Sequence, residues 1–358
     1  MEKAYKLAKL GIGKTNPNPL VGAIIVKNDT IVGQGYHKCA GDAHAEIYAL
    51  NQAGKKAKNA DLYVTLEPCS HYGKTPPCTE AIIKAGIKKV FIGIKDSNPL
   101  VNGKGIKILK NANIEVKIGI LEEKIKEMNQ FYAKYITQKI PYVILKVATS
   151  LDGKICTETG DSKYITNEIS RNYVHKLRSQ IDAIIVGIET IKKDNSKLTC
   201  RLKKGGNPIR IILDTKGKIP LNSNVITQNF DKKTYVALTD LASFETIKKL
   251  EQKDIKILKI KTKNGQIDLN DLLKKLWEMK ISNVLVEGGE KVFTSFLENK
   301  LVDKIMVFIA PMLIGGKSKT FFSSQKIKKI TESIKLTKTS FKKFREDILI
   351  NNYVYWYN

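Results

Sequence analysis

Four side chains that suit a metal site stand in two short segments of the first half of the chain. His44 is followed two positions later by Glu46, and eight residues separate Cys69 from Cys78. One imidazole and two thiolates are a usual ligand set for zinc, and three protein ligands leave the fourth position open, as in catalytic sites. A fold that uses this set must bring both segments together, which is the strongest constraint in the sequence.

The carboxylate of Glu46 suits proton transfer beside such a metal. Zinc lowers the pKa of a bound water to about 7, and a carboxylate that does not bind the metal can move its protons. Zinc-dependent base deaminases have this order of residues, but with two residues between their cysteines. The alternative is a closed structural site with Cys39 or His71 as fourth ligand. The adjacent Glu46 counts against it, because a structural zinc needs no such neighbour.

Length and composition favour two domains in a cytoplasmic protein. The 358 residues exceed one ordinary domain, and 42% of them are hydrophobic, which is enough for packed cores. No apolar run is long enough for a transmembrane helix, and the N-terminus lacks the apolar core of a signal peptide. Five cysteines in such a chain argue against a disulfide framework. We therefore expect a soluble cytoplasmic protein with no membrane partner.

The formal net charge of +27 would suit a nucleic-acid partner, but the kind of basic residue does not. Only five residues are Arg, and the other basic residues are Lys spread along the whole chain. Arginine is the residue favoured for bidentate recognition of phosphates and bases, whereas scattered lysine is typical of a solvated surface. We expect no nucleic-acid partner. The charge remains compatible with a small anionic substrate.

Strands and helices are predicted to alternate through both halves of the chain. Apolar runs predict strands at 21–26, 31–36, 62–66, 90–94, 114–118, 142–147, 183–187, 209–213, 235–238, 255–260 and 284–287. Amphipathic spacing predicts helices at 2–10, 43–54, 78–86, 104–111, 168–178, 242–252, 268–279 and 290–299. The pattern indicates an α/β fold with a mixed sheet in the first half and buried parallel strands in the second. Both metal-binding segments then fall near helix N-termini, where the macrodipole favours thiolate.

The boundary between the halves is expected near residue 141. The segment 121–139 is predicted to be one connecting helix, which Ile140-Pro141 ends. Further on, the strand at 284–287 leads through Gly288-Gly289 into a helix. Glycine there lets a phosphate approach backbone N–H groups at a helix start, although a plain tight turn is an alternative. The spacing is not a full dinucleotide-binding fingerprint, so a Rossmann domain is not supported.

Several motifs occur in the order found in the bifunctional deaminase–reductases of riboflavin biosynthesis, which this sequence resembles over nearly its whole length. The long run from Pro68 to Cys78 separates this family from base deaminases. The motifs are Asn18-Pro19-Leu20-Val21-Gly22, the run 68–78, the run 146–154, the run 160–166, Asp194-Asn195 with Leu198-Thr199-Cys200-Arg201, and Val286-Glu287-Gly288-Gly289.

The resemblance implies two consecutive reactions. Residues 1–140 would form a cytidine-deaminase-like α/β/α sandwich that uses Zn²⁺ to deaminate 2,5-diamino-6-ribosylamino-4(3H)-pyrimidinone 5′-phosphate. Residues 141–358 would form a dihydrofolate-reductase-like α/β domain that uses NADPH to reduce the ribosyl group to ribityl. The product would be 5-amino-6-ribitylaminouracil 5′-phosphate. The resemblance also implies a homo-oligomer.

The resemblance implies roles for particular residues. In the first domain His44, Cys69 and Cys78 would bind zinc and Glu46 would shuttle protons. The pyrimidine substrate there would contact Asn18, His71 and Lys74. NADPH would contact Ala148, Tyr164 (where some relatives carry Trp), Thr190, Asp194, Thr215, Gly289, Glu290, Lys291, Val292, Phe293, Thr294 and Ser295. The substrate of the reductase would contact Ser162, Arg178, Leu198, Arg201 and Glu287.

Three rival interpretations make different predictions. A nucleic-acid or nucleoside base deaminase with an appended unrelated domain predicts two residues between the cysteines, which the spacing of Cys69 and Cys78 contradicts. A non-enzymatic zinc-binding protein predicts no NADPH affinity and no loss of function for Glu46→Gln. An enzyme with one degenerate half predicts missing motif positions. All named positions are present, so we expect both halves to be active.

Overall fold

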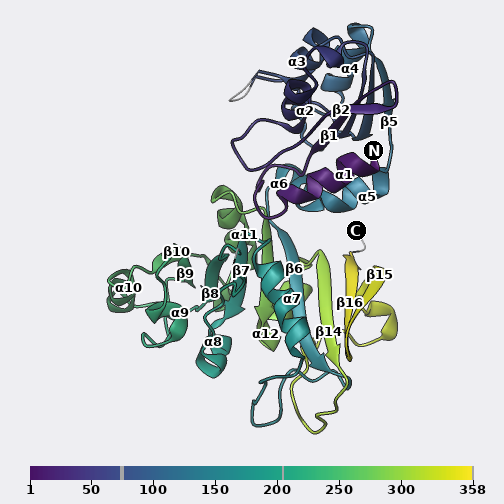
Figure 1. Cartoon of the computed structure of the whole chain (residues 1–358). Helices are drawn as coiled ribbons and strands as arrows, with labels where there is room; N and C mark the ends of the chain where they lie inside the picture. Colours follow the sequence, from purple (N-terminus) through teal and green to yellow (C-terminus); the bar gives the residue numbers. More distant parts are fainter. Residues whose placement is uncertain (73–75, 204, 357–358) are drawn as a thin grey trace. The chain divides into compact units, whose positions relative to one another are not determined.

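The computed structural model describes residues 1–72, 76–203 and 205–356. The chain divides into two compact units, Met1–Ile140 and Pro141–Asn358 (Figure 1). None of the helices in the described part of the chain has both the length and the apolar character that crossing a bilayer would need. Each unit is built on its own mixed sheet, which confirms the predicted α/β class.

The first unit contains a five-stranded sheet in the order β2-β1-β3-β4-β5 within the described residues. β1 runs antiparallel to β2 and β3, whereas β3, β4 and β5 are parallel to one another. Asn28 and Asp29, which join β1 to β2, have φ values of 47° and 58°, as the hairpin turn requires. The strands are β1 (Gly22–Lys27), β2 (Thr30–Tyr36), β3 (Asp61–Leu66), β4 (Lys89–Ile94) and β5 (Glu115–Ile118).

Helices cover both faces of this sheet. A Cβ at Gly22 of β1 would lie 2.1 Å from the carbonyl oxygen of Ala4 in α1, and one at Gly35 of β2 would lie 2.4 Å from the carbonyl oxygen of Ala45 in α2. Gly35 pairs with Ala23, so the two glycines point to opposite faces and α1 and α2 lie on opposite sides. The helices of this unit are α1 (Glu2–Ala8), α2 (Ala45–Ala53), α3 (Cys78–Lys84), α4 (Lys104–Asn111), α5 (Glu122–Met128), α6 (Gln130–Gln138) and the 3₁₀ turns η1 (Lys9–Gly11) and η2 (Gly54–Ala57).

The prediction of one continuous helix over 121–139 is wrong. The segment forms α5 and α6, with Asn129 between them at φ −108° and ψ 14°. The Asn129 side chain is buried and exchanges two hydrogen bonds with the backbone of Leu20, at 2.8 and 3.0 Å. An asparagine that bonds to backbone elsewhere competes with helical geometry, which explains the break. The same contact anchors the loop that contains Asn18.

The second unit contains a nine-stranded sheet within its described residues, in the order β10-β9-β8-β7-β13-β6-β14-β16-β15. The strands from β10 to β14 in that order are parallel, and β16 and β15 are antiparallel to their neighbours. The strands are β6 (Tyr142–Ser150), β7 (Ala183–Gly187), β8 (Ile209–Leu213), β9 (Thr234–Leu238), β10 (Lys256–Lys259), β13 (Asn283–Gly288), β14 (Lys304–Ala310), β15 (Lys335–Phe344) and β16 (Asp347–Tyr355). A separate small hairpin pairs β11 (Thr262–Lys263) with β12 (Gln266–Ile267).

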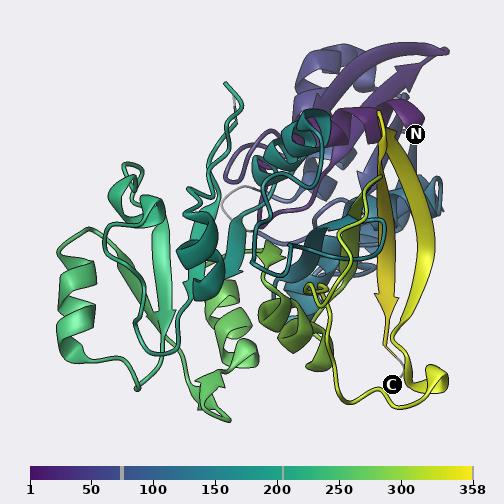
Figure 2. The ribbon, with the colours of Figure 1, turned by 90° about the horizontal axis from the view of Figure 1, so that it is seen from below.

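The C-terminal strands extend the sheet beyond the last element predicted from sequence, the helix at 290–299. Figure 2 shows β15 and β16 in yellow as a long antiparallel ribbon. The first nine residues of β15 are exposed, so the strand has no buried face that would produce an apolar alternation. This absence of alternation explains why sequence patterning missed β15.

Helices of the second unit pack against its sheet around separate apolar clusters. Side chains of α8, α9 and α10 pack on β7, β8 and β9, and Val174 and Leu177 of α7 pack with Met306, Phe308 and Leu349 of β14 and β16. The sequence patterns did not predict α8 or α9. The helices are α7 (Glu168–Arg178), α8 (Ile188–Asp194), α9 (Asn224–Thr227), α10 (Phe244–Glu251), α11 (Leu269–Glu278), α12 (Glu290–Glu298) and the 3₁₀ turn η3 (Ile330–Glu332).

The close approach of α2 to β2 generates a prediction. Gly35→Ala should lower the local opening free energy of α2 and β2 by about 1–3 kcal/mol, because the added Cβ overpacks a backbone contact. Hydrogen–deuterium exchange resolved by peptide measures this. The control is Gln34→Ala, since Gln34 is exposed on the same strand and should leave protection unchanged. Equal protection in both variants would contradict the packing argument.

Candidate active sites

The structure brings His44, Cys69 and Cys78 together. His44 is the N-cap residue of α2 in an extended conformation, Cys69 follows the end of β3, and Cys78 is the first residue of α3. One ligand atom from each residue lies within 4.8 Å of the others, and among the described residues this group contains neither Cys39 nor His71. Cys39 is exposed and its thiol donates to Asp42 at 3.2 Å. The group therefore offers three ligand atoms, which is the number found in zinc sites with an open fourth position.

The spacing of these atoms fits a zinc ion. His44 Nδ1 lies 3.2 Å from Cys78 Sγ and 3.5 Å from Cys69 Sγ. Zinc–ligand bonds of about 2.0–2.3 Å in a tetrahedron place ligand atoms about 3.3–3.8 Å apart. The backbone N–H of Cys78 also donates to Cys69 Sγ at 3.2 Å, which favours a thiolate there.

Hydrogen bonds within the group shift the pKa values of its three side chains in different directions. The pKa of Cys69 lies well below its usual range, because Cys78 and then His44 donate to its sulfur. The pKa of Cys78 is raised, because its thiol is the donor to Cys69. The pKa of His44 rises to about 9, chiefly through its hydrogen bond with Cys69. The shifts favour the thiolate at Cys69, which is the form that binds a metal, whereas a metal ion would have to displace the protons of Cys78 and His44.

Glu46 lies in the first turn of α2, next to the three ligands. Its side chain is buried, and burial raises its pKa to about 7, although the charge of His44 opposes the increase. Burial disfavours the charged carboxylate because the low-dielectric interior solvates it poorly. A carboxyl group whose pKa lies near the operating pH can both accept and donate a proton, as general acid–base chemistry requires.

Asn18 is held by a histidine that the sequence analysis did not single out. His37 Nδ1 lies 3.1 Å from the carbonyl oxygen of Ala43, so a neutral ring donates there and accepts from Asn18 Nδ2 at its Nε2, 3.2 Å away. Burial lowers the pKa of His37, which favours the neutral ring. The arrangement orients the Asn18 amide and leaves its oxygen available to a ligand. Only the nearness of His37 to His44 in sequence could have suggested it.

A buried carboxylate fixes the segment that contains Cys69. Glu67 is 2% exposed and accepts hydrogen bonds from the backbone N–H groups of Asp96, Gly103 and Ile106 at 3.2, 2.9 and 3.2 Å. These bonds tie the end of β3 to the start of α4. The buried charge is thereby satisfied, and the position of Cys69 is set by the loop after β4.

Of the two remaining predicted substrate residues of the first unit, the structure describes one. His71 is exposed between Cys69 and the start of α3. The neighbouring Tyr72 is also exposed and donates its O–H to Glu80 at 2.8 Å. Lys74 lies outside the described residues.

The second unit contains a cavity of about 1350 Å³. It is lined by segments at the ends of three parallel strands: Gly187 to Thr190 at the end of β7, Leu213 and Thr215 at the end of β8, and Gly288 to Phe293 at the end of β13. Ligands in open α/β sheets bind at the carboxyl ends of parallel strands, where these segments meet. The predicted NADPH residues that line the cavity are Ala148, Tyr164, Thr190, Asp194, Thr215, Gly289, Glu290, Lys291, Val292, Phe293 and Ser295.

The start of α12 suits the phosphates of a dinucleotide. Gly289 is its N-cap, so the first N–H groups of a nine-residue helix face the cavity. A Cβ at Gly187 would lie 2.8 Å from a methyl group of Val292, so glycine allows α12 to approach β7 closely. Thr294 is not among the described residues that line the cavity. Its hydroxyl oxygen accepts a hydrogen bond from the backbone N–H of Ser323 at 3.2 Å. The prediction that Thr294 contacts the cofactor is therefore not supported by the geometry.

A charged cluster occupies the other part of the cavity. Arg178 Nε and Nη2 donate to the two oxygens of Glu287, each at 2.8 Å, and Lys146 Nζ lies 3.9 Å from Glu287. Burial acts to raise the pKa of Glu287, but Arg178 and Lys146 outweigh it and hold that pKa at about 2. Burial lowers the pKa of Lys146. The cluster is thus a fixed carboxylate between two cations.

The predicted substrate residues Ser162, Arg178, Leu198, Arg201 and Glu287 all line this cavity. Ser162 also donates to Asp194 at 3.3 Å.

The cavity lining also includes Lys146, Arg171 and His175, to which the sequence analysis assigned no role. The guanidinium of Arg171 stacks 4.2 Å above the ring of Tyr164. Arg171, His175 and Arg178 are spaced by four and three residues, so they share one face of α7. Lys146 stands two positions before Ala148 on β6 and shares its face. The helical spacing on α7 and the alternation along β6 were the sequence signals that could have identified these residues.

Removal of a proposed ligand gives a direct test of the metal group. Cys78→Ser should lower the zinc content of the purified chain from about one ion towards zero, because hydroxyl is a poor zinc ligand. Elemental analysis by mass spectrometry measures this. Cys39→Ser is the matched control and should retain zinc. Loss of zinc in the control would instead make Cys39 a ligand.

Comparisons with known proteins agree with this geometry. Residues 141–350 match the family model of the RibD C-terminal domain, and residues 1–94 match the cytidine and deoxycytidylate deaminase zinc-binding region. Riboflavin biosynthesis protein RibD of Aquifex aeolicus (strain VF5) is 46% identical over 352 residues, which cover 98% of this chain and 96% of that protein. RibD of Bacillus amyloliquefaciens is 47% identical over 317 residues, covering 88% of this chain and 85% of that protein.

Solved structures extend the similarity to three dimensions. Acinetobacter baumannii RibD, form 1, has a TM-score of 0.88 at 37% identity and covers 99% of this chain and 98% of its own. The diaminohydroxyphosphoribosylaminopyrimidine deaminase/5-amino-6-(5-phosphoribosylamino)uracil reductase of Thermotoga maritima has a TM-score of 0.84 at 38% identity, with 99% and 97% of the two chains covered. The chain belongs to the RibD family, the bifunctional deaminase–reductase enzymes of riboflavin biosynthesis, which use zinc and NADPH.

Proposed function

We propose that residues 1–140 deaminate 2,5-diamino-6-ribosylamino-4(3H)-pyrimidinone 5′-phosphate and that residues 141–358 reduce the ribosyl group of the product. The observation that supports this division is the presence of one complete site in each unit. His44, Cys69 and Cys78 form a three-ligand group beside the buried Glu46, and the second unit contains the large cavity with its charged cluster.

In the proposed deamination, Glu46 moves the protons. His44, Cys69 and Cys78 would hold a zinc ion, which would lower the pKa of a water molecule to about 7. Glu46 would accept the two protons of that water in turn, delivering the first to the ring nitrogen and the second to the leaving amine. The water oxygen becomes bonded to the ring carbon, and ammonia leaves. Asn18, oriented by His37, binds the pyrimidine through its amide oxygen.

In the proposed reduction, the protein positions two ligands against each other. Bound NADPH would supply a hydride to the carbon of the opened sugar imine, so no protein nucleophile is needed. The start of α12 holds the cofactor phosphates. Arg201 and the cluster of Arg178 and Glu287 bind the ribosyl phosphate substrate, for which arginine offers bidentate geometry.

The substrate is a small phosphorylated pyrimidine, and His71 and Lys74 are proposed to contact it in the first unit. We also propose that the chain forms a homo-oligomer and that it is located in the cytoplasm. Light scattering after size-exclusion chromatography tests the first, and fractionation of cells that express the chain tests the second.

Substitution of Glu46 tests the deaminase assignment. Glu46→Gln should reduce ammonia release about 10²–10⁴-fold or more, because the amide cannot shuttle protons. Mass spectrometry of the diaminopyrimidine phosphate, incubated with and without NADPH, should then show neither product. The deaminated ribosyl compound, supplied directly, should still be reduced.

The control for this variant is Glu122→Gln, an exposed carboxylate of the same unit, which should leave both reactions unchanged. Zinc content should also stay unchanged in Glu46→Gln. Normal ammonia release by Glu46→Gln would exclude this residue as the proton shuttle.

Substitution of Arg201 tests the substrate side of the reductase. Arg201→Ala should lower kcat/KM for the ribosyl substrate about 10- to 100-fold, because a hydrogen bond to a charged group contributes about 1.5–3 kcal/mol. Steady-state kinetics that follow NADPH absorbance measure this. Lys203→Ala, an exposed cation two residues away, should have no effect. Equal kinetics in both variants would remove Arg201 from the site.

A further inference from the structure

A single peptide group in the substrate loop of the second unit is held from both sides. The loop is the segment 198–201, which contains Leu198 and Arg201 and lines the cavity. Arg178 Nη1 donates to the carbonyl oxygen of Thr199 at 3.1 Å, and the N–H of Cys200 donates to Asn207 Oδ1 at 3.0 Å. That carbonyl and that N–H belong to the same peptide plane. Its rotation is therefore fixed by two independent contacts.

The contact on the cavity side comes from the charged cluster. Arg178 makes its bond to Thr199 with one nitrogen and uses the other two for Glu287. Because Arg178 is already fixed by the carboxylate, its remaining donor has a defined direction.

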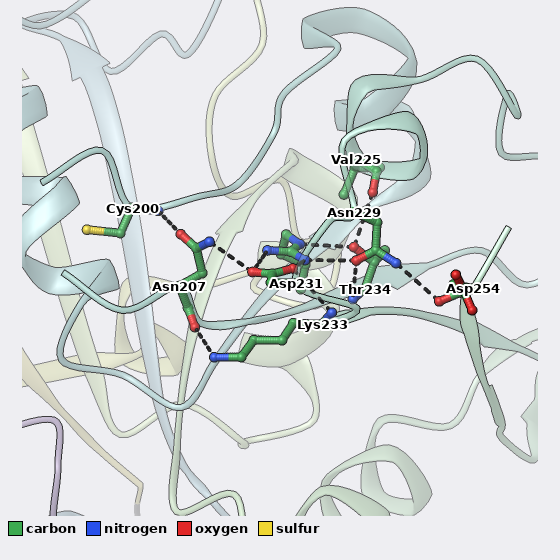
Figure 3. Close-up of polar contacts among 9 residues, drawn as sticks. Cys200, Asn207, Val225, Asn229, Asp231, Lys233, Thr234 and Asp254 are labelled. Atoms are coloured by element: carbon green, nitrogen blue, oxygen red, sulfur yellow. Dashed lines mark hydrogen bonds and ion pairs between the residues drawn. The ribbon is translucent and has the colours of Figure 1, made fainter. Parts of the chain in front are cut away.

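The contact on the opposite side comes from a polar network outside the cavity lining (Figure 3). Asn207 Nδ2 donates to Asp231 Oδ2 at 2.8 Å, and Asp231 forms a bidentate ion pair with Arg210, whose Nη1 lies 3.1 Å from the same oxygen. Lys233 adds a bond from its ammonium to the carbonyl oxygen of Asn207 at 3.1 Å. Both ends of Asn207 are thereby held.

Arg210 gives this network a rigid end. Its side chain is 2% exposed, compared with 28% for that of Asp231. Nε donates to Thr234 at 2.9 Å and Nη2 donates to Asn229 at 2.9 Å, in addition to the pair with Asp231. A buried guanidinium with this many partners cannot move without leaving donors unsatisfied. The network thus connects the core of the sheet, at β8 and β9, to the substrate loop.

The orientation of the Thr199–Cys200 peptide determines where the loop side chains point. Leu198 is buried with a φ of 56°, a conformation that a leucine adopts only when its surroundings hold it. Arg201 directly follows Cys200, whose Sγ also lies 3.4 Å from the carbonyl oxygen of His175. Rotation of the peptide before Cys200 would redirect both Leu198 and Arg201.

We propose that Asn207, held by Asp231 and Arg210, is a positioning residue for the reductase: it orients the Thr199–Cys200 peptide so that Arg201 meets the phosphorylated ribosyl substrate. Asn207 itself is outside the cavity lining and does not contact the substrate. The inference rests on the proposed role of Arg201 in binding that substrate. Since Asn207 acts on the substrate loop alone, it should affect substrate binding more than cofactor binding.

The experiment compares two alanine variants of the full-length chain. Asn207→Ala removes the acceptor of the Cys200 N–H, whereas Asn229→Ala removes another partner of Arg210 that does not touch the loop. Asn207→Ala should raise KM for the ribosyl substrate about 3- to 10-fold, with a smaller change in kcat and an unchanged Kd for NADPH. Asn229→Ala should leave KM unchanged even if it lowers the melting temperature.

A reciprocal exchange provides a rescue. Asn207→Asp alone places a second carboxylate beside Asp231 and should also raise KM. In the double variant N207D/D231N, the carboxylate at position 207 still accepts from the Cys200 N–H. The amide at position 231 then donates to that carboxylate, which restores a hydrogen bond between the two positions. It should recover part of the lost affinity, because one contact to Arg210 is still missing.

The outcomes separate the inference from the proposed substrate site. Unchanged KM in Asn207→Ala, while Arg201→Ala is impaired, would overturn the positioning role and leave the substrate site standing. An equal rise of KM in Asn229→Ala would reduce the effect to general loss of stability and would also overturn it. Unchanged kinetics in both Asn207→Ala and Arg201→Ala would overturn the inference together with the proposed role of Arg201. The Kd for NADPH, measured on the same samples, reports whether the second unit is folded.

Discussion

Buried carboxylates with satisfied charges hold the loops on which both candidate sites depend. In the first unit Glu67 accepts three backbone N–H groups and ties the segment of Cys69 to the start of α4. In the second unit Glu287 fixes Arg178, which holds the carbonyl of Thr199. A buried charge is tolerated only when it is paired or hydrogen-bonded, so each of these carboxylates requires its surrounding loop to adopt one conformation.

The pKa values of two buried carboxylates, Glu46 and Glu287, are shifted in opposite directions. Glu46 is buried near one imidazole, and its pKa rises to about 7. Glu287 is buried between Arg178 and Lys146, and its pKa falls to about 2. Burial alone raises the pKa of a carboxyl group, and two adjacent cations reverse the effect. The neighbours therefore make Glu46 suitable for proton exchange, whereas Glu287 stays charged and suits positioning.

Sequence patterning predicted most of the strands and helices that have a regular buried face, as far as the helix at 290–299. It failed where a polar contact broke the pattern or where no face was buried, and it also missed α8, α9, β14 and β16, which do bury side chains. Asn129 interrupts the expected helix at 121–139 through its bonds to Leu20, and the exposed β15 offers no alternation. In the sites, motif positions led to many residues that line the cavity, but His37 and Arg171 lay outside those motifs, and Lys146 lay within the run 146–154 without an assigned role. Their contributions come from contacts with residues distant in sequence.

The sequence by itself determined the chemistry available to this chain: which residues can bind a metal, which carboxylate stands beside them, and where glycines allow a helix start to face a phosphate. Side-chain type and local spacing are enough for such statements, because they depend on covalent structure and on the periods of helix and strand. Only the tertiary structure decided the state of those groups. The pKa of Glu46, the ion pair of Glu287 and the clamp on the Thr199–Cys200 peptide depend on burial and on partners from other elements, and these arise only when the sheets and helices pack.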